Sequence, residues 1–401
     1  MPQSKRPPDS LSKTKQSSKP DKIKIKRNTS TTQNNNNNKN TNNTNSTNNN
    51  TNTARNSKNY TTTNPLVLSQ FKTILNTFQH TFSHLFTPEL PQIIQSVKQS
   101  LYLRDYVAAF DSPEKLQAYV VRWSVARALA YFEMISGHWW SEDVTQIFST
   151  SRRLRVTCVG GGAGAEIVGI TAAYSFLRSS SPSPPPPSSP SIGVGGEDVD
   201  TGLDLTFLDF ATWAPITDSF YTTITDPTKE SNFFLDKSKI SARCYQQDVL
   251  TPLSDTTVSS MASADIVTIL FTAGELYSQS PTATTKFFMS LHTITKPGAL
   301  LVVVDSAGGF EDLDVLKKNQ QGNSSGGGES GKVQPDGNIG GYKLGFLLDK
   351  TLTNREQWQT VVSQDAKWWR VPQELKDTGG YPLELENMRC LIRVYRRNDD
   401  P

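Results

Sequence analysis

Five short, mostly apolar runs constrain the fold of this chain more than any other feature. They alternate with stretches of helical periodicity, and four of the five end at a glycine or an aspartate. Apolar strands separated by helices are typical of a parallel sheet that helices cover on both faces. The sequence therefore predicts an α/β fold. Its predicted strands are Leu154–Val159, Leu203–Leu208, Ser241–Gln247, Asp265–Phe271 and Ala299–Val304.

A helical region precedes the first strand. From Phe71 onwards, apolar residues recur there at intervals of three and four. Further helices are predicted over residues 91–106 and 113–136, the second starting at Pro113 with Asp111 or Ser112 as its cap. The predicted regions are a tail at 1–64, an N-terminal helical region at 65–150 and a sheet domain at 151–401.

The tail differs in composition from the rest of the chain. Residues 1–60 contain twelve Lys or Arg and two Asp, a net charge of +10, whereas the remaining 29 basic and 36 acidic residues give −7. Runs of Asn, Thr and Ser cannot bury a core, so we expect the tail to be disordered. Its stretch Lys19–Arg27 fits a nuclear import signal or a phosphate-binding arm, or a solvated segment without a partner. Low-complexity inserts at 178–202 and 318–340 are predicted to be flexible surface loops.

Several classes of protein are not expected. The polar N-terminus lacks the apolar region of a secretory signal, and no run of about 18 apolar residues is present to span a membrane. Cys158, Cys244 and Cys390 lie far apart in apolar contexts, which favours buried thiols over disulfides or zinc ligands. His80 and His84 are four residues apart without a nearby third ligand, so no metal is expected.

A glycine-rich loop follows the first predicted strand. Gly160, Gly162 and Gly164 stand at GxGxG spacing, and Glu166 opens the apolar helical run after them. Glycines let the backbone turn tightly and let a ligand approach the main chain. A structural strand-to-helix turn is the alternative, because one glycine loop is weak evidence by itself.

Two acids strengthen the interpretation of this loop as a nucleotide-type cofactor site. Asp209 ends the second strand 45 residues after Gly164, and without the 25-residue insert the separation is 20. At about that spacing a carboxylate meets ribose hydroxyls. Asp248 ends the third strand, where an acid can accept a hydrogen bond from an adenine amine.

The cofactor is predicted to be S-adenosylmethionine rather than NAD. Dinucleotide enzymes prefer GxGxxG, which places pyrophosphate at the helix N-terminus. Glu166 at that position disfavours pyrophosphate and tolerates a cation. S-adenosylmethionine carries a sulfonium and an ammonium group and no phosphate. The chain contains no GxxxxGK[ST] motif, which excludes a P-loop nucleotidase.

At this point the chain resembles a known family. It is similar to the fungal large-subunit (25S) rRNA uridine-N3 methyltransferases, a class I S-adenosylmethionine-dependent family. The resemblance covers about residues 90–396 apart from the inserts. The matching stretches are Tyr102–Tyr106, Ala109–Asp111, Tyr119–Ser124, Arg127–Tyr131, Cys158–Glu166, Leu208–Asp209, Trp213, Leu270–Leu276, Asp305–Ser306, Trp368–Arg370 and Met388–Arg396.

The resemblance implies a Rossmann-like, seven-stranded, mostly parallel sheet and methylation of N3 of one uridine. The last two strands would be Trp358–Val362 and Met388–Tyr395, the latter antiparallel, and Phe271 would lie at the cofactor. The implied substrate is large-subunit rRNA or a pre-ribosomal particle. We expect a monomer in the nucleus and nucleolus, with the cytoplasm as the alternative.

Methylation of uracil N3 sets the chemistry of the candidate catalytic residues. N3 bears a proton and becomes nucleophilic only when that proton leaves, so the site needs a base or a group that stabilises the anion. Glu275 after the fourth strand and Asp305 after the fifth are the candidates. Their structural alternatives are a carboxylate at a helix start for Glu275 and an N-cap or turn former for Asp305.

Aromatic and basic residues are candidates for substrate binding. Arg122 and Arg127 suit a phosphate or the cofactor carboxylate, and Trp123 suits stacking on a base. Trp369 and Arg370 repeat the pattern, although core packing and solvated arginines remain alternatives. Three other functions are alternatives: a methyltransferase of the same fold that acts on a protein or small molecule, a non-catalytic ribosome-assembly factor, and an NAD-linked oxidoreductase. The sequence offers no Tyr/Lys or His/Asp arrangement for hydride transfer, which disfavours the last.

Overall fold

The computed structural model describes residues 64–137, 139–140, 142–149, 152–180, 201–228, 234–307, 343–354, 356–377 and 380–399. All of them belong to one compact unit, Lys58–Pro401. The predicted tail up to residue 63, the insert residues 181–200 and the whole insert 318–340 lie outside the described residues, and so does the basic stretch Lys19–Arg27.

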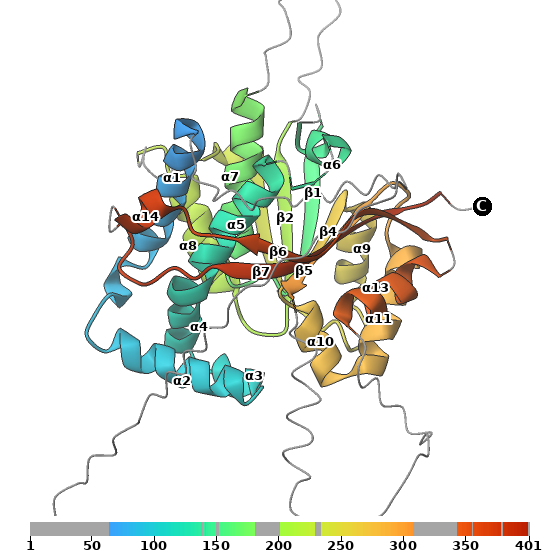
Figure 1. Ribbon diagram of the computed structural model, residues 1–401, viewed down its shortest axis with the longest axis horizontal. Helices are drawn as coiled ribbons and strands as arrows, with labels where there is room; N and C mark the ends of the chain where they lie inside the picture. The colour runs from blue at the N-terminus through green and yellow to red at the C-terminus, as the bar shows by residue number, and fades with distance from the viewer. Residues whose placement is uncertain are drawn as a thin grey trace, which may run out of the picture. The chain divides into compact units, whose positions relative to one another are not determined.

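A seven-stranded sheet forms the centre of this unit (Figure 1). Its spatial order is β3-β2-β1-β4-β5-β7-β6, with β1 to β5 parallel and β7 antiparallel to both of its neighbours. The predicted Rossmann-like fold is therefore confirmed. The strands are β1 Leu154–Val159, β2 Leu203–Asp209, β3 Ile240–Gln246, β4 Ile266–Leu270, β5 Leu300–Ser306, β6 Trp358–Trp369 and β7 Met388–Arg397.

The predicted strands agree with the structure to within one or two residues, except at β6. That strand continues to Trp369 instead of ending at Val362. It lies at the edge of the sheet, carries many exposed polar side chains, and shifts register after Thr360 and after Gln364. Because the shifts disrupt the two-residue alternation, hydrophobic pattern alone misses the second half of the strand.

Helices cover both faces of the sheet. In Figure 1 the helices α1, α5, α7 and α8 lie on one side, and the yellow to red helices α9, α10, α11 and α13 lie on the other. The helices that come before β3 in the chain are α1 Pro65–Thr81, α2 Leu90–Tyr102, α3 Tyr106–Ala109, α4 Pro113–Tyr119, α5 Val125–Ser136, α6 Glu142–Gln146, α7 Ala165–Ser180 and α8 Ala214–Ile224. Those that come after β3 are α9 Asp255–Ser263, α10 Ala273–Gln279, α11 Pro281–Ile294 and α13 Leu344–Thr353, and a short α14, Gln373–Asp377, precedes β7.

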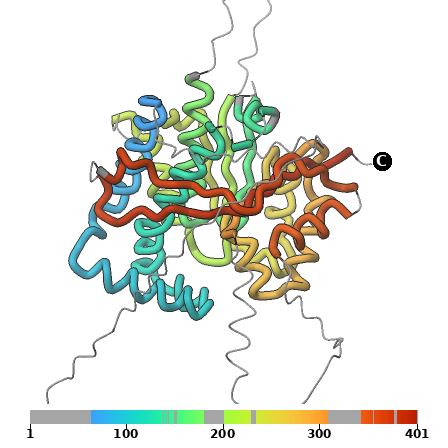
Figure 2. Tube along the Cα trace, viewed as in Figure 1, coloured from blue at the N-terminus to red at the C-terminus, as the bar shows by residue number. Residues whose placement is uncertain are grey.

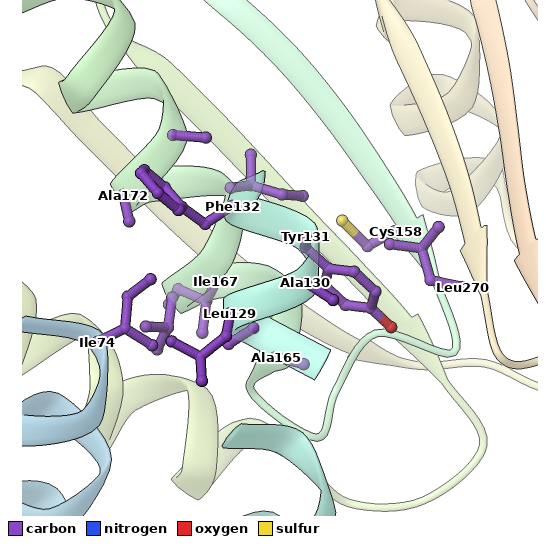
Figure 3. Close-up of a cluster of buried hydrophobic side chains, with 14 of the residues drawn as sticks. Ile74, Leu129, Ala130, Tyr131, Phe132, Cys158, Ala165, Ile167, Ala172 and Leu270 are labelled. Atoms are coloured by element: carbon purple, nitrogen blue, oxygen red, sulfur yellow. The ribbon is translucent and has the colours of Figure 1, made fainter. Parts of the chain in front are cut away.

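The N-terminal helices are fixed by their caps and by the core. Asn64 accepts a hydrogen bond from the Leu66 N–H at 2.9 Å, and Ser112 accepts one from Lys115 at 3.4 Å, each just before a proline at the first helical position. Of the two predicted caps, Asp111 and Ser112, the structure therefore uses Ser112. The helices then pack on α7: Figure 3 shows Phe132 of α5 near Ala172, and Tyr131 on the side of Cys158 and Leu270.

One predicted helix, 113–136, is interrupted. Residues Val120–Ser124 form a π-helix, here the π turn, between α4 and α5. A π turn holds one extra residue and leaves backbone carbonyls in need of other partners. The Tyr381 hydroxyl donates to the Val121 carbonyl at 2.7 Å, from the segment before β7. Figure 2 shows the red C-terminal segment passing beside the teal helices that precede β1.

The remaining sequence expectations concern cysteines and membranes. Cys158 and Cys390 are buried as predicted, whereas Cys244 is half-buried, and all three are free thiols. In the part of the chain that the structure describes, no helix is both long and apolar enough to cross a bilayer.

Candidate active site

The carboxyl ends of the parallel strands meet at one edge of the sheet, and the glycine loop lies there. Gly160 and Gly164 have φ values of 74° and 85°, in the left-handed region that favours glycine. A Cβ at Gly160 would come within 2.2 Å of the Thr272 hydroxyl, and one at Gly162 within 2.4 Å of the Trp213 ring. The tight turn is as predicted. The close neighbours are protein side chains, so packing already requires these glycines.

Asp209 ties β2 to the glycine loop. Its two carboxylate oxygens accept hydrogen bonds from the Gly162 and Ala211 N–H groups, each at 3.2 Å, and the residue is 7% exposed. Burial raises the pKa of Asp209 to about 6, although the backbone hydrogen bonds favour the ionised form.

Two adjoining cavities meet at Asp209. The outer cleft, of about 380 Å³, reaches Asp248 and Val249 after β3. The inner chamber, of about 60 Å³, reaches Glu166 at the start of α7 and Glu275 at the start of α10. The residues that line both cavities are Gly160, Asp209, Phe210, Thr272, Leu276 and Gln279. The structure thus brings most of the predicted cofactor residues together around two cavities that share lining residues.

The inner chamber is acidic. Burial raises the pKa of Glu166 to about 8, while nearby Arg127 opposes the shift. Burial, with Asp305 and Asp209 adding repulsion, likewise raises the pKa of Glu275 to about 8, again against the effect of Arg127. Three carboxyl groups around one guanidinium make a chamber that a cationic ligand stabilises.

This set of groups fits S-adenosylmethionine. Its ammonium and sulfonium charges suit the inner chamber, where Glu166, Asp209 and Glu275 lie. Its adenosine suits the outer cleft, where Asp209 and Asp248 offer oxygen acceptors and Phe210 offers an aromatic ring. A pyrophosphate would meet acids instead of donors, as the sequence predicted.

Arg127 lies between the inner chamber and a third cavity. Its guanidinium carbon is 4.7 Å from the centre of the Phe271 ring and 5.6 Å from that of Tyr119, and its Nη1 donates to the Tyr119 hydroxyl at 2.5 Å. Phe271 has a φ of 57°, which is uncommon outside glycine. Such strained residues cluster at functional sites.

The third cavity, here the acceptor pocket, has a volume of about 250 Å³. Arg127 and Phe271 line it as well as the inner chamber. Its wall combines the π turn, the ends of β4 and β5, and the start of β7. The residues are Arg122, Trp123, Ala126, Arg127, Phe271, Ser306, Glu386, Asn387, Met388 and Arg389.

The structure unites the predicted substrate residues Arg122, Trp123 and Arg127 in the acceptor pocket. Sequence reasoning missed the wall formed by Glu386–Arg389. The available signal was topological: β7 is antiparallel, so its first residues lie at the edge where β4 and β5 end. Phe210 and Tyr119 were also missed, because aromatic residues in a globular chain are most often core.

Gly162 and Gly164 line none of the three cavities, and of the predicted catalytic and substrate residues three lie outside them as well. Trp369 is 1% exposed and donates its indole N–H to Glu133 at 2.9 Å, so the prediction of a substrate contact is wrong, and core packing holds. Arg370 lies 5.1 Å from the ring of exposed Trp368, and it lines neither cofactor cavity nor the acceptor pocket.

Asp305 is the third. Its carboxylate accepts hydrogen bonds from the Gly274 N–H at 2.8 Å and from its own neighbour Ser306 at 2.7 Å, and it is 7% exposed. Its carboxylate therefore holds the first turn of α10, the structural alternative predicted for it, and its role as a catalytic base stays a prediction. Among the described residues, no group of three or more His, Cys, Asp or Glu is arranged to hold a metal ion.

Comparisons with known proteins agree with this geometry. Residues 76–396 match a family described as "Putative SAM-dependent methyltransferase", where SAM denotes S-adenosylmethionine. A 25S rRNA (uridine(2843)-N(3))-methyltransferase from Saccharomyces cerevisiae is 26% identical over 343 residues, covering 81% of this chain and 85% of the yeast protein.

Solved structures with a similar fold are more distant. A SAM-dependent methyltransferase from Methanosarcina mazei is 12% identical, with 61% of this chain and 93% of that chain covered and a TM-score of 0.34. The N-methyltransferase NodS from Bradyrhizobium japonicum is 13% identical, with 77% and 99% covered and a TM-score of 0.31. The yeast relative confirms the resemblance predicted from the sequence, and the extent of the family match shows that this chain belongs to the family of SAM-dependent methyltransferases.

Proposed function

We propose that this enzyme methylates N3 of a uridine in large-subunit rRNA during ribosome biogenesis, acting as a monomer in the nucleolus. One observation carries the proposal: a pocket rich in arginine and aromatic residues adjoins the inner chamber through Arg127 and Phe271. Arginine and aromatic side chains are the groups that bind an unstacked base and its phosphates. The name of the yeast relative points to the same substrate.

The acceptor pocket suits a base taken out of its stack. N3 lies on the Watson–Crick edge of uracil and is inaccessible in a paired base. Trp123 is half-buried beside Tyr119, with ring centres 5.2 Å apart, and it presents an aromatic face next to Arg122. A uracil between Trp123 and Phe271 would reach the boundary of the inner chamber.

Glu275 is the proposed base. Its pKa of about 8 lies near physiological pH, where a general base is most effective. It takes the N3 proton, and the N3 lone pair is then available. When bound, SAM supplies the methyl group as a carbon attached to sulfonium, and its transfer leaves S-adenosylhomocysteine.

Arg127 is proposed to stabilise the uracil anion. Removal of the N3 proton leaves a negative charge shared by N3 and the two carbonyl oxygens. The Arg127 guanidinium, held between Phe271 and Tyr119, faces both cavities and needs no reorganisation to meet that charge. Preorganised positive groups of this kind are a major source of catalysis.

Methyl transfer from labelled SAM to unmodified large-subunit rRNA and pre-ribosomal particles tests the proposal, with digestion to nucleosides. Label in 3-methyluridine supports it. Label in another nucleoside would retain the enzyme class and refute the uridine assignment. Label only in protein, or none on RNA despite cofactor binding, would refute an RNA substrate.

A further inference from the structure

The acceptor pocket contains an ion pair that the proposed chemistry does not use. Three arginines line the pocket, Arg122, Arg127 and Arg389, together with one acid, Glu386. Arg122 pairs with Glu386 through its Nη2 and donates from Nη1 to the Glu384 carbonyl at 3.2 Å. In the described ranges, Arg389 forms no ion pair.

The two members of this pair differ in how firmly they are held. The Arg122 side chain is 17% exposed, lies 5.5 Å from the Trp123 ring, and keeps the carbonyl contact in addition to the carboxylate. The Glu386 side chain is 53% exposed. A pair with one partner so exposed contributes little to stability, so the carboxylate exchanges readily for another anion.

The backbone around Glu386 is anchored on both sides. Before it, Tyr381 donates to the π turn at Val121 and packs edge-on against Phe86, with ring centres 5.8 Å apart. After it, the Asn387 side chain accepts a hydrogen bond from Val371 at 2.8 Å. The Glu386 side chain can therefore leave Arg122 without movement of the loop that forms the pocket.

A phosphodiester is the anion that fits best. The planar guanidinium fork of arginine matches phosphate oxygens in bidentate geometry, and two such groups, Arg122 and Arg389, lie in the pocket wall. The aromatic faces of Trp123 and Phe271 lie in the same wall, where a base would lie next to its own phosphate. A nucleotide brings a base for these rings together with its phosphate, whereas an acidic side chain brings only a carboxylate.

We propose that Arg122 and Arg389 form a phosphodiester subsite, and that Glu386 occupies it in the free protein as an internal carboxylate that RNA displaces. The inference rests on the proposed RNA substrate. It gives Glu386 a role in selectivity, because only a strand that brings a base and a phosphate together gains enough contacts to replace the internal pair.

The test is binding of a fluorescent, uridine-containing single-stranded RNA, measured by anisotropy at fixed salt. Glu386→Gln should tighten binding by about two- to fivefold, the equivalent of one exposed ion pair. Glu384→Gln is the matched control: it removes the same charge two residues away, and its contact to Arg122 uses only the backbone. The control should change affinity less than Glu386→Gln does.

A double-mutant cycle makes the test specific to the pair. Arg122→Gln should weaken binding, and Glu386→Gln should then bring no further gain in that background. Equal effects of Glu386→Gln and Glu384→Gln, or a gain that persists without Arg122, would overturn the inference.

Two further outcomes separate the inference from the proposed function. Failure of the wild-type protein to bind this RNA, unmodified rRNA and pre-ribosomal particles alike would refute the RNA substrate itself. If a poly-glutamate peptide competes with the RNA and gains the same affinity from Glu386→Gln, the subsite takes acidic protein segments, and the phosphodiester inference is overturned.

Discussion

The inner chamber and the acceptor pocket share one wall and differ in their ionisable side chains, which are mostly carboxyl groups in the chamber and mostly arginines in the pocket. Glu166, Asp209 and Glu275 surround the chamber, whereas the pocket holds Arg122 and Arg389 with only Glu386 against them. The side chains of Arg127 and Phe271 form the shared wall. This difference explains how two ligands of opposite charge can bind at one edge of the sheet. The carboxyl groups of the chamber favour a cationic methyl donor, and the arginines of the pocket favour a polyanionic acceptor.

The largest effect is expected at the shared wall. Arg127→Met should lower kcat about 10²–10³-fold, as the loss of one preorganised charge does elsewhere, and should change S-adenosylhomocysteine affinity only a few-fold. Arg127→Lys, which keeps the charge and loses the planar stack, should retain intermediate activity. Steady-state kinetics and calorimetry separate the two effects. Loss of cofactor binding with a normal kcat would mean that Arg127 contacts only the cofactor and does not stabilise the uracil anion.

Asp209→Ala should weaken cofactor binding in the inner chamber and leave RNA binding in the acceptor pocket unchanged. It removes the cofactor contact and leaves the Gly162 and Ala211 N–H groups without their acceptor, so S-adenosylhomocysteine affinity should fall about 100-fold. Exposed Asp248→Ala should cost about tenfold or less. RNA anisotropy should be unchanged for both variants. A matching loss of RNA affinity would show that the two cavities are not independent.

Trp123→Leu should weaken RNA binding in the acceptor pocket and leave cofactor binding in the inner chamber nearly unchanged. Loss of one stacked ring should weaken RNA binding about tenfold, while cofactor affinity stays within a factor of two. Trp123→Phe keeps an aromatic face and should recover most of the affinity. Equal losses for the Leu and Phe variants would mean that Trp123 acts through packing against Tyr119.

Acidic pH should weaken the binding of a cationic ligand in the inner chamber more than the binding of a neutral one. The pKa values of Glu166 and Glu275 are about 8 in the free protein, so both are largely protonated near pH 6, and a cation binds their ionised forms. SAM affinity should therefore rise about three- to tenfold from pH 6 to 7.5, with proton release. Neutral 5′-methylthioadenosine, titrated by calorimetry in parallel, should show little change. A flat profile for SAM would contradict the acidic chamber.

The smallest effect concerns stability. An acid whose pKa is higher in the folded state than in the unfolded state stabilises the fold at low pH, and that stability falls as pH rises between the two values. For Glu275 the window runs from about 4.5 to about 8. Glu275→Gln should therefore raise the free energy of unfolding by about 1 kcal/mol at pH 8 while abolishing methyl transfer.

Glu114→Gln is the control for Glu275→Gln. Glu114 is also an acid in the first turn of a helix, but it is exposed. Chemical denaturation at pH 5 and pH 8 should show no change for Glu114→Gln. A stabilisation by Glu275→Gln that is equal at both pH values would refute the pH window.

The chamber was far easier to predict from the sequence than the pocket. Its residues lie at or shortly after the ends of β1, β2 and β4, so strand ends and glycine spacing locate Gly160, Asp209 and Glu275 without tertiary information. The pocket depends on contacts between segments more than 250 residues apart, such as Arg122 with Glu386. No local pattern encodes that pairing.

Two errors have the same cause. The π turn at Val120–Ser124 is stabilised by Tyr381, a residue that no helical periodicity includes. Trp369 carried an attractive aromatic-basic motif, but its neighbour Glu133 on α5 and its place in the sheet bury it. In each case the residue types indicate which interactions the side chains can make. The tertiary contacts determine whether those side chains are exposed to a ligand.

Photo-crosslinking tests most directly the central claim that acceptor RNA lies in the arginine-lined pocket beside the cofactor chamber. An RNA containing 4-thiouridine would be irradiated with the full-length protein and S-adenosylhomocysteine, and the adducts mapped by mass spectrometry. The structure predicts adducts on Trp123, Phe271 or Met388, lost when unlabelled RNA competes. Adducts confined to other surfaces, such as the polar groove at Arg243 and Tyr245 between β3 and α9, would contradict the account.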